Sequence, residues 1–155
     1  MIDLKSDPAG LTLLKADLET EHGHVIVQFY PNEAPKTVAR ITELMNQGFY
    51  NGLKFHRVVP NFVAQGGDPT GTGAGGSGQK LKAEFNSRKH VPGAMAMARS
   101  GDPDSADSQF YICLNTIPHL DGAYTVFGQV TSGMEVVQKI QQDDVIKKVT
   151  LIQAP

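Results

Sequence analysis

Residues 55–68 read FHRVVPNFVAQGGD and place an arginine and a glutamine inside an otherwise apolar run. The pattern, broken at Pro60 and Asn61, predicts short strands over residues 54–59 and 62–65. Apolar neighbours would hold the guanidinium of Arg57 by packing, although an ordinary surface arginine at a strand edge explains the same local pattern. The run contains no serine or cysteine that could attack a substrate.

Composition narrows the class of protein. The chain has 155 residues, which predicts one domain over 1–155, and its 14 Lys plus Arg against 16 Asp plus Glu give a net charge of −2. No broad basic field exists for a nucleic-acid partner. No apolar run approaches the length of a membrane span and no signal peptide opens the chain, so we expect a cytoplasmic protein without a membrane partner. The lone Cys113 lies in an apolar run, and inert packing explains it better than a reactive thiol does.

Hydrophobic periodicity predicts a mainly β architecture. Strands are expected over 11–20 and 24–30, joined by a turn at 21–23, and over 94–98, 110–114, 126–130 and 146–152. One helix is expected over 37–45, with its buried face formed by Val38, Ile41, Leu44 and Met45. A second helix is expected over 134–140. Strands and helices do not alternate regularly, which favours a barrel or sandwich with helical caps over a parallel sheet.

Several familiar motifs are incomplete. Residues 71–78, GTGAGGSG, contain a literal G-x-G-x-x-G, but no strand leads into it and no helix opens after it, so we interpret it as a surface loop. His22 and His24 have no third ligand at a suitable spacing, so no metal site is predicted. The remaining histidines show no nucleophile-elbow pattern beside a serine, which leaves a serine or metal hydrolase without support.

Taken together, FYNGLKFHR (49–57), FVAQGGD (62–68), SQFYI (108–112) and VFGQV (126–130) resemble the cyclophilin family of peptidyl-prolyl cis-trans isomerases. The resemblance covers nearly the whole chain from about Leu14 onward, in family order. It implies an eight-stranded antiparallel β-barrel capped by two α-helices. It also implies an isomerase of X-Pro peptide bonds that needs no cofactor and no metal.

The resemblance assigns roles to individual residues. It makes Arg57 the catalytic residue. It implies that the substrate contacts Phe62, Val63, Tyr111 and Leu120 in a proline pocket, Gln65 and Gln109 along the backbone, Ala98, Arg99 and Ser100 on a wall, Gly71 on a neighbouring rim, and His119 and Tyr124 at the pocket edge. The expected partners are proline-containing peptides and unfolded protein chains, and a monomer is the simplest assembly.

Three positions depart from the family pattern. Val63 stands where many members have methionine, and Tyr124 replaces a common histidine. His119 occupies a position often held by tryptophan, whose indole N-H supports cyclosporin binding, so weak cyclosporin binding is expected. An alternative function uses the same pocket: a proline-peptide binding module whose catalysis is incidental.

Overall fold

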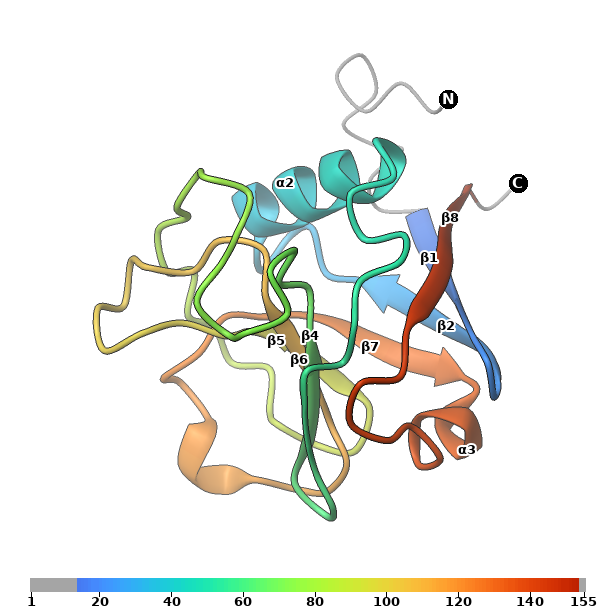
Figure 1. The fold of residues 1–155 in the computed structure, drawn as a ribbon. Helices are drawn as coiled ribbons and strands as arrows, with labels where there is room; N and C mark the ends of the chain where they lie inside the picture. The colour runs from blue at the N-terminus through green and yellow to red at the C-terminus, as the bar shows by residue number, and fades with distance from the viewer. Residues whose placement is uncertain (1–13, 154–155) are drawn as a thin grey trace.

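The computed structural model describes residues 14–153, whose strands form one curled antiparallel sheet (Figure 1). The strands are β1 (Leu14–Thr20), β2 (Gly23–Phe29), β3 (Arg57–Val59), β4 (Val63–Gly66), β5 (Ala94–Met97), β6 (Phe110–Cys113), β7 (Val126–Ser132) and β8 (Ile146–Gln153). Their order in the sheet is β3-β4-β6-β5-β7-β2-β1-β8. This confirms the eight-stranded antiparallel fold. The first three residues of the predicted strand 11–20 lie outside the described residues.

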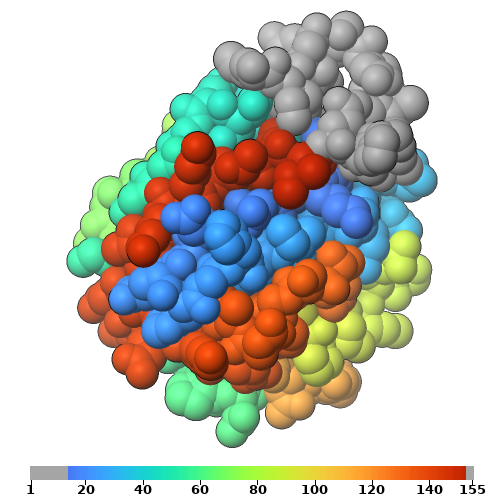
Figure 2. All heavy atoms as spheres, turned by 90° about the vertical axis from the view of Figure 1, so that its right-hand side faces the viewer, coloured from blue at the N-terminus to red at the C-terminus, as the bar shows by residue number. Residues whose placement is uncertain are grey.

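The hairpin of β1 and β2 follows the predicted alternation. Buried Leu14, Ala16 and Leu18 on β1 alternate with partly exposed residues, and Val25 and Val27 continue the same face on β2. The opposite face is open to solvent, as is usual for antiparallel sheets. Figure 2 shows β8, β1, β2 and β7 as adjacent bands across this face.

Helix α2 (Pro35–Asn46) packs its apolar stripe against the sheet, and the four residues predicted for that stripe are all buried. Pro35 suits the first turn because it has no N-H to satisfy. The carboxylate of Glu84 accepts hydrogen bonds from the N-H groups of Lys36 (3.2 Å) and Thr37 (2.7 Å). A distant side chain therefore supplies the N-terminal cap that the local sequence lacks.

The second predicted helix is shorter than expected. Helix α3 covers Met134–Val137, whereas 134–140 was predicted. Beyond it the chain tightens into turns, with the N-H of Lys139 bonded to the carbonyl of Val136 and that of Ile140 to Val137. These turns bury Ile140. Among residues 14–153 the remaining helical element is a 3-10 turn, η1 (Pro118–Leu120), and no helix in this range is long and apolar enough to cross a bilayer.

The two ends of the sheet meet at a seam that precedes β3 and β8. Lys54 pairs with Val145, and backbone bonds join Phe55 N to Asp144 O (2.8 Å) and Ile146 N to Leu53 O (2.8 Å). The predicted strand 54–59 is wrong in its first half for this reason. Its first residues hydrogen-bond to the segment before β8, and only the residues of β3 pair with β4.

Two apolar clusters lie on opposite faces of the sheet. On β6, Phe110 and Ile112 face the large interior cluster, while Tyr111 and Cys113 face a smaller one. Burial on both faces explains why β6 is apolar at every position. The smaller cluster supports the partly buried side chains of Tyr30, Phe62, Ala98, Leu120 and Tyr124.

Candidate active site

Strand register places the polar residues of residues 55–68 in one row with Tyr111. Arg57 on β3 lies opposite Gln65 on β4, and Gln65 lies opposite Tyr111 on β6. Directly opposed residues project to the same face of a sheet. The row therefore points away from the interior cluster and toward the smaller one.

A cavity of about 220 Å³ opens over this row. It is lined by Arg57, Phe62, Val63, Gln65, Ala98, Arg99, Tyr111, Leu120 and Tyr124. The guanidinium of Arg57 lies 5.7 Å from the ring centroid of Phe62, within cation-π range. Arg57 is otherwise exposed, so the cavity combines an apolar floor with a solvent-accessible charged donor, and Arg99 supplies a second guanidinium to its lining.

A chain of side-chain hydrogen bonds runs from Arg57 to the glycine-rich loop. Nη1 of Arg57 donates to Oε1 of Gln65 (3.3 Å), and Nε2 of Gln65 donates to Oε1 of Gln109 (3.1 Å). Nε2 of Gln109 then donates to the carbonyls of Gly73 and Gly75, each at 2.9 Å. The amide of Gln65 thus accepts from Arg57 and donates to Gln109, and the amide of Gln109 accepts from Gln65 and donates to the loop, which fixes the orientation of both glutamines.

Two carboxylates hold the glycine-rich loop in a tight turn. Asp68 is buried and accepts from the N-H groups of Thr70 (2.8 Å), Thr72 (3.1 Å) and Gly73 (2.6 Å). Burial would raise the pKa of Asp68, but hydrogen bonds from the hydroxyl and N-H of Thr70 and from the N-H groups of Gly75 and Gly73 outweigh it and hold the pKa well below its usual range. Asp107 accepts from the N-H groups of Ser77 (2.7 Å) and Gly78 (3.0 Å).

Glycine is required where the loop meets these carboxylates. A Cβ atom at Gly75 would lie 2.2 Å from Oδ1 of Asp68, and one at Gly76 would lie 2.6 Å from the carboxylate of Asp107. Residues 67–93 contain turns and bends but no helix. The literal G-x-G-x-x-G is therefore a carboxylate-anchored loop, and it lacks the helix that a dinucleotide fingerprint needs.

The loop borders a second cavity of about 350 Å³ beside the first. Gln65, Ala98 and Arg99 line both cavities. The second also contains Gly73–Gly76, Lys80, Ser100, Ser105, Asp107 and Gln109. Sequence reasoning missed most of the loop residues because the glycine run carries no side chains whose chemistry would single them out.

Arg99 forms the partition between the two cavities. Its guanidinium stacks over the ring of Tyr124, 4.6 Å from the centroid, and Nη2 donates to the carbonyl of Ala123 (2.8 Å). Nη1 donates to the carbonyl of Ser100 (2.9 Å). Several backbone acceptors thus fix an arginine that the sequence alone would leave mobile.

Tyr111 is tied to a buried histidine. Its hydroxyl lies 2.8 Å from Nε2 of His90, and Nδ1 of His90 lies 3.0 Å from the carboxylate of Asp121. Burial lowers the pKa of His90, against the raising effect of Asp121. An ionised carboxylate only accepts, so Nδ1 carries the proton of the neutral ring and Nε2 accepts from the hydroxyl of Tyr111.

The remaining predicted residues are more scattered. The ring of His119 stacks on Phe62 with centroids 6.3 Å apart, but His119 lines neither cavity. Gly71 lines neither cavity. Cys113 is buried in the smaller cluster, where burial raises the pKa of its thiol to about 12, and an un-ionised thiol is a poor nucleophile.

Known proteins with similar sequences cover nearly all of the described residues. Residues 15–154 match the family model of the cyclophilin-type peptidyl-prolyl cis-trans isomerases. The chain is 50% identical over 124 residues to peptidyl-prolyl cis-trans isomerase B of Bacillus subtilis, with 79% of this chain and 86% of that protein covered. It is 46% identical over 138 residues to a peptidyl-prolyl cis-trans isomerase of Helicobacter pylori, with 86% and 84% covered.

Solved structures agree with the sequence matches. A crystal structure of a cyclophilin-type isomerase from Cryptosporidium parvum aligns with a TM-score of 0.85 at 28% identity, covering 91% of this chain and 98% of that one. The same protein, solved in the presence of the dipeptide Ala-Pro, aligns with a TM-score of 0.84 at 26% identity, covering 90% and 99%. The chain belongs to the family of cyclophilin-type peptidyl-prolyl cis-trans isomerases.

Proposed function

We propose that this protein catalyses rotation about X-Pro peptide bonds in peptides and unfolded protein chains and so assists protein folding, as a single-domain monomer in the cytoplasm. The observation that carries the proposal is the placement of Arg57 at the mouth of an apolar cavity of about 220 Å³. The related Cryptosporidium protein solved in the presence of Ala-Pro supports a proline-containing ligand.

The reaction needs stabilisation of a twisted amide and no bond cleavage. Rotation removes amide resonance, which leaves a barrier of about 18–20 kcal/mol and an uncatalysed time of tens of seconds. In the twisted state the prolyl nitrogen becomes pyramidal and its lone pair localises. A catalyst has to bind this state more tightly than the planar one.

Arg57 supplies the donor that this state requires. Its guanidinium stays protonated and can donate to the developing lone pair and to the prolyl carbonyl. Phe62, Val63, Tyr111 and Leu120 take the proline ring out of water, and Gln65 with Gln109 align the substrate backbone. Raising the rate from about 10⁻² to about 10³ per second requires about 7 kcal/mol. One charged hydrogen bond contributes only about 1.5–3 kcal/mol, so contacts with the apolar pocket and with the substrate backbone supply the rest of the transition-state stabilisation.

The second cavity extends the substrate site. Ala98, Arg99 and Ser100 form the wall along which residues preceding proline lie, and the loop residues 73–76 close its far side. His119 and Tyr124 border the proline ring. No metal or cofactor takes part in this mechanism.

The test is the cis-trans exchange rate of a short X-Pro peptide, read by NMR without a coupled protease. Arg57→Ala should lower kcat/KM about 10²–10³-fold. The control is Arg88→Ala, because Arg88 also stacks on an aromatic ring, 4.0 Å over Tyr30, and lines neither cavity. Undiminished exchange in Arg57→Ala would overturn the assigned role. Peptide binding by the wild type without faster exchange would instead identify a proline-binding module.

A further inference from the structure

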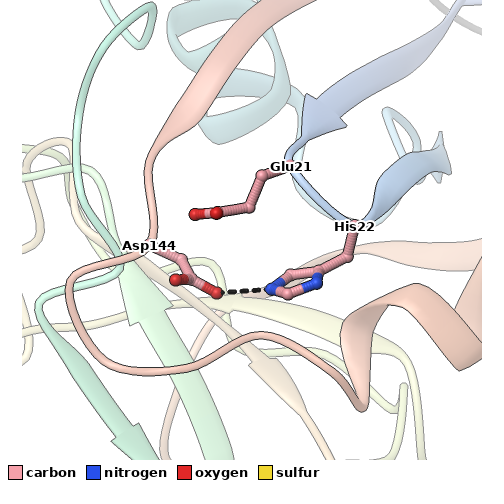
Figure 3. Close-up of side chains that lie close together, drawn as sticks. All are labelled: Glu21, His22 and Asp144. Carbon is pink, nitrogen blue, oxygen red and sulfur yellow. Dashed lines mark hydrogen bonds and ion pairs between the residues drawn. The ribbon is translucent and has the colours of Figure 1, made fainter.

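A cluster of potential metal ligands lies apart from both cavities. Glu21 and His22 occupy the turn between β1 and β2, and Asp144 lies in the loop before β8 (Figure 3). One ligand atom from each side chain lies within 4.8 Å of the other two. Nε2 of His22 and Oδ2 of Asp144 are 2.8 Å apart. The pairing spans 122 residues, which is why the spacing of the histidines gave no sign of it.

Hydrogen bonds to the backbone hold both sides of the cluster. In the turn, the hydroxyl of Thr20 donates to the carbonyl of Gly23 (3.0 Å) and accepts from the N-H of His22 (3.1 Å). In the loop, the carboxylate of Asp144 accepts from the N-H of Gln141 (2.8 Å), and the backbone of Asp144 belongs to the seam with Phe55. A metal ion bound here would find the side chains of His22 and Asp144 already held close together.

The donor set suits a particular class of cation. One imidazole nitrogen with two carboxylate oxygens fits borderline ions such as Zn²⁺, whereas Mg²⁺ and Ca²⁺ prefer oxygen donors alone. Tetrahedral Zn²⁺ with bonds of about 2.0–2.1 Å places its ligand atoms about 3.3 Å apart. His22 and Asp144 would need to separate by about half an ångström. Glu21 is exposed and has the rotational freedom to complete the set.

We propose that Glu21, His22 and Asp144 form a three-ligand Zn²⁺ site that joins the β1–β2 turn to the loop before β8. Water completes the coordination at the exposed side. The site is independent of isomerisation, since its residues line neither cavity. Its consequence is structural: an ion bound only by the folded chain stabilises that chain in proportion to the logarithm of its concentration.

The test is calorimetric titration of the tag-free, chelator-treated protein with Zn²⁺, followed by thermal unfolding with and without the ion. The wild type should bind one Zn²⁺, and its Tm should rise with Zn²⁺ concentration. His22→Asn should weaken this binding at least tenfold. The matched control is His24→Asn, because His24 forms the same kind of pair with Asp17 (2.9 Å) but is in no three-ligand cluster found in residues 14–153.

A second variant separates ligation from folding. Glu21→Gln removes one ligand but leaves the His22–Asp144 pair, so it should weaken Zn²⁺ binding about tenfold while the metal-free Tm stays at the wild-type value. Replacement of Zn²⁺ by Co²⁺ should give the visible absorption of a tetrahedral site. Absence of stoichiometric binding, or binding equal in the wild type and both cluster variants, would show that the three residues form an ion pair only.

Discussion

The hydroxyl of Tyr111 lies 2.8 Å from Nε2 of His90. A residue that lines the first cavity is therefore hydrogen-bonded to a fully buried imidazole. The stacked rings of the two residues, with centroids 5.9 Å apart, add contact area to this bond. The position of the Tyr111 ring therefore depends on a residue that itself lies outside the cavity lining.

Tyr111→Phe should destabilise the protein but preserve most of its activity. The substitution keeps the ring that lines the cavity and leaves Nε2 of His90 buried without a donor, which costs about 1–3 kcal/mol. Urea unfolding measures the loss, and peptide exchange by NMR should give a kcat/KM within a few-fold of wild type. An unchanged free energy of unfolding would show that the bond contributes nothing.

His90 should also make stability depend on pH. Because burial lowers the pKa of His90, this imidazole is protonated near pH 6.5 in the unfolded chain but stays neutral there in the folded chain. The free energy of unfolding should therefore fall as the pH drops below about 6.5 and continue to fall down to the folded-state pKa. Protonation of Nε2 would also turn it into a donor, so the Tyr111 hydroxyl would have to accept from it instead of donating to it.

A variant isolates this effect from the other histidines. Asp17 raises the pKa of His24, so the contribution of that pair is present at low pH and lost as the pH rises, opposite in sign to His90. His90→Gln should change less in stability between about pH 7 and pH 5 than the wild type does. The free energy of unfolding is measured by urea denaturation at both pH values. An equal change in the two proteins would refute the role of His90.

Gln109→Leu should reduce activity by breaking the hydrogen-bond chain between Gln65 and the loop. Without it Gln65 loses its acceptor and the carbonyls of Gly73 and Gly75 lose their donor. We expect kcat/KM to fall about tenfold, equivalent to about 1.4 kcal/mol of transition-state stabilisation. Gln129→Leu is a suitable control, because Gln129 likewise donates to a backbone carbonyl, that of Pro92, outside both cavities. An equal fall in the control would mean that the effect is one of stability.

His119→Trp should strengthen cyclosporin binding. His119 already stacks parallel to Phe62, so an indole ring can take the same plane and bring the N-H that the resemblance associates with the drug. Titration calorimetry on both proteins, with X-Pro exchange as a check on the site, gives the comparison. If the affinity for cyclosporin is unaltered, position 119 does not determine it. Val63 is then the next residue to substitute.

Local patterns predicted the elements better than their arrangement. The strands around Arg57 and Gln65 were visible because turn residues bound a short apolar run. The row that joins these two residues to Tyr111 depends on register between strands far apart in sequence, and β6 is buried on both faces, so periodicity could not tell which way Tyr111 points. The roles of Asp68 and Asp107 were also hidden, because their partners are backbone N-H groups that any loop possesses.

The pairing of β1 with β8 has a consequence for how the chain folds in the cell. Leu14 lies opposite Gln153, so the first described strand gains its second neighbour only from the last. Such distant pairing gives a high contact order and slows folding. During synthesis, β1 and β2 can form a hairpin early, but the sheet cannot complete until β8 has emerged from the ribosome.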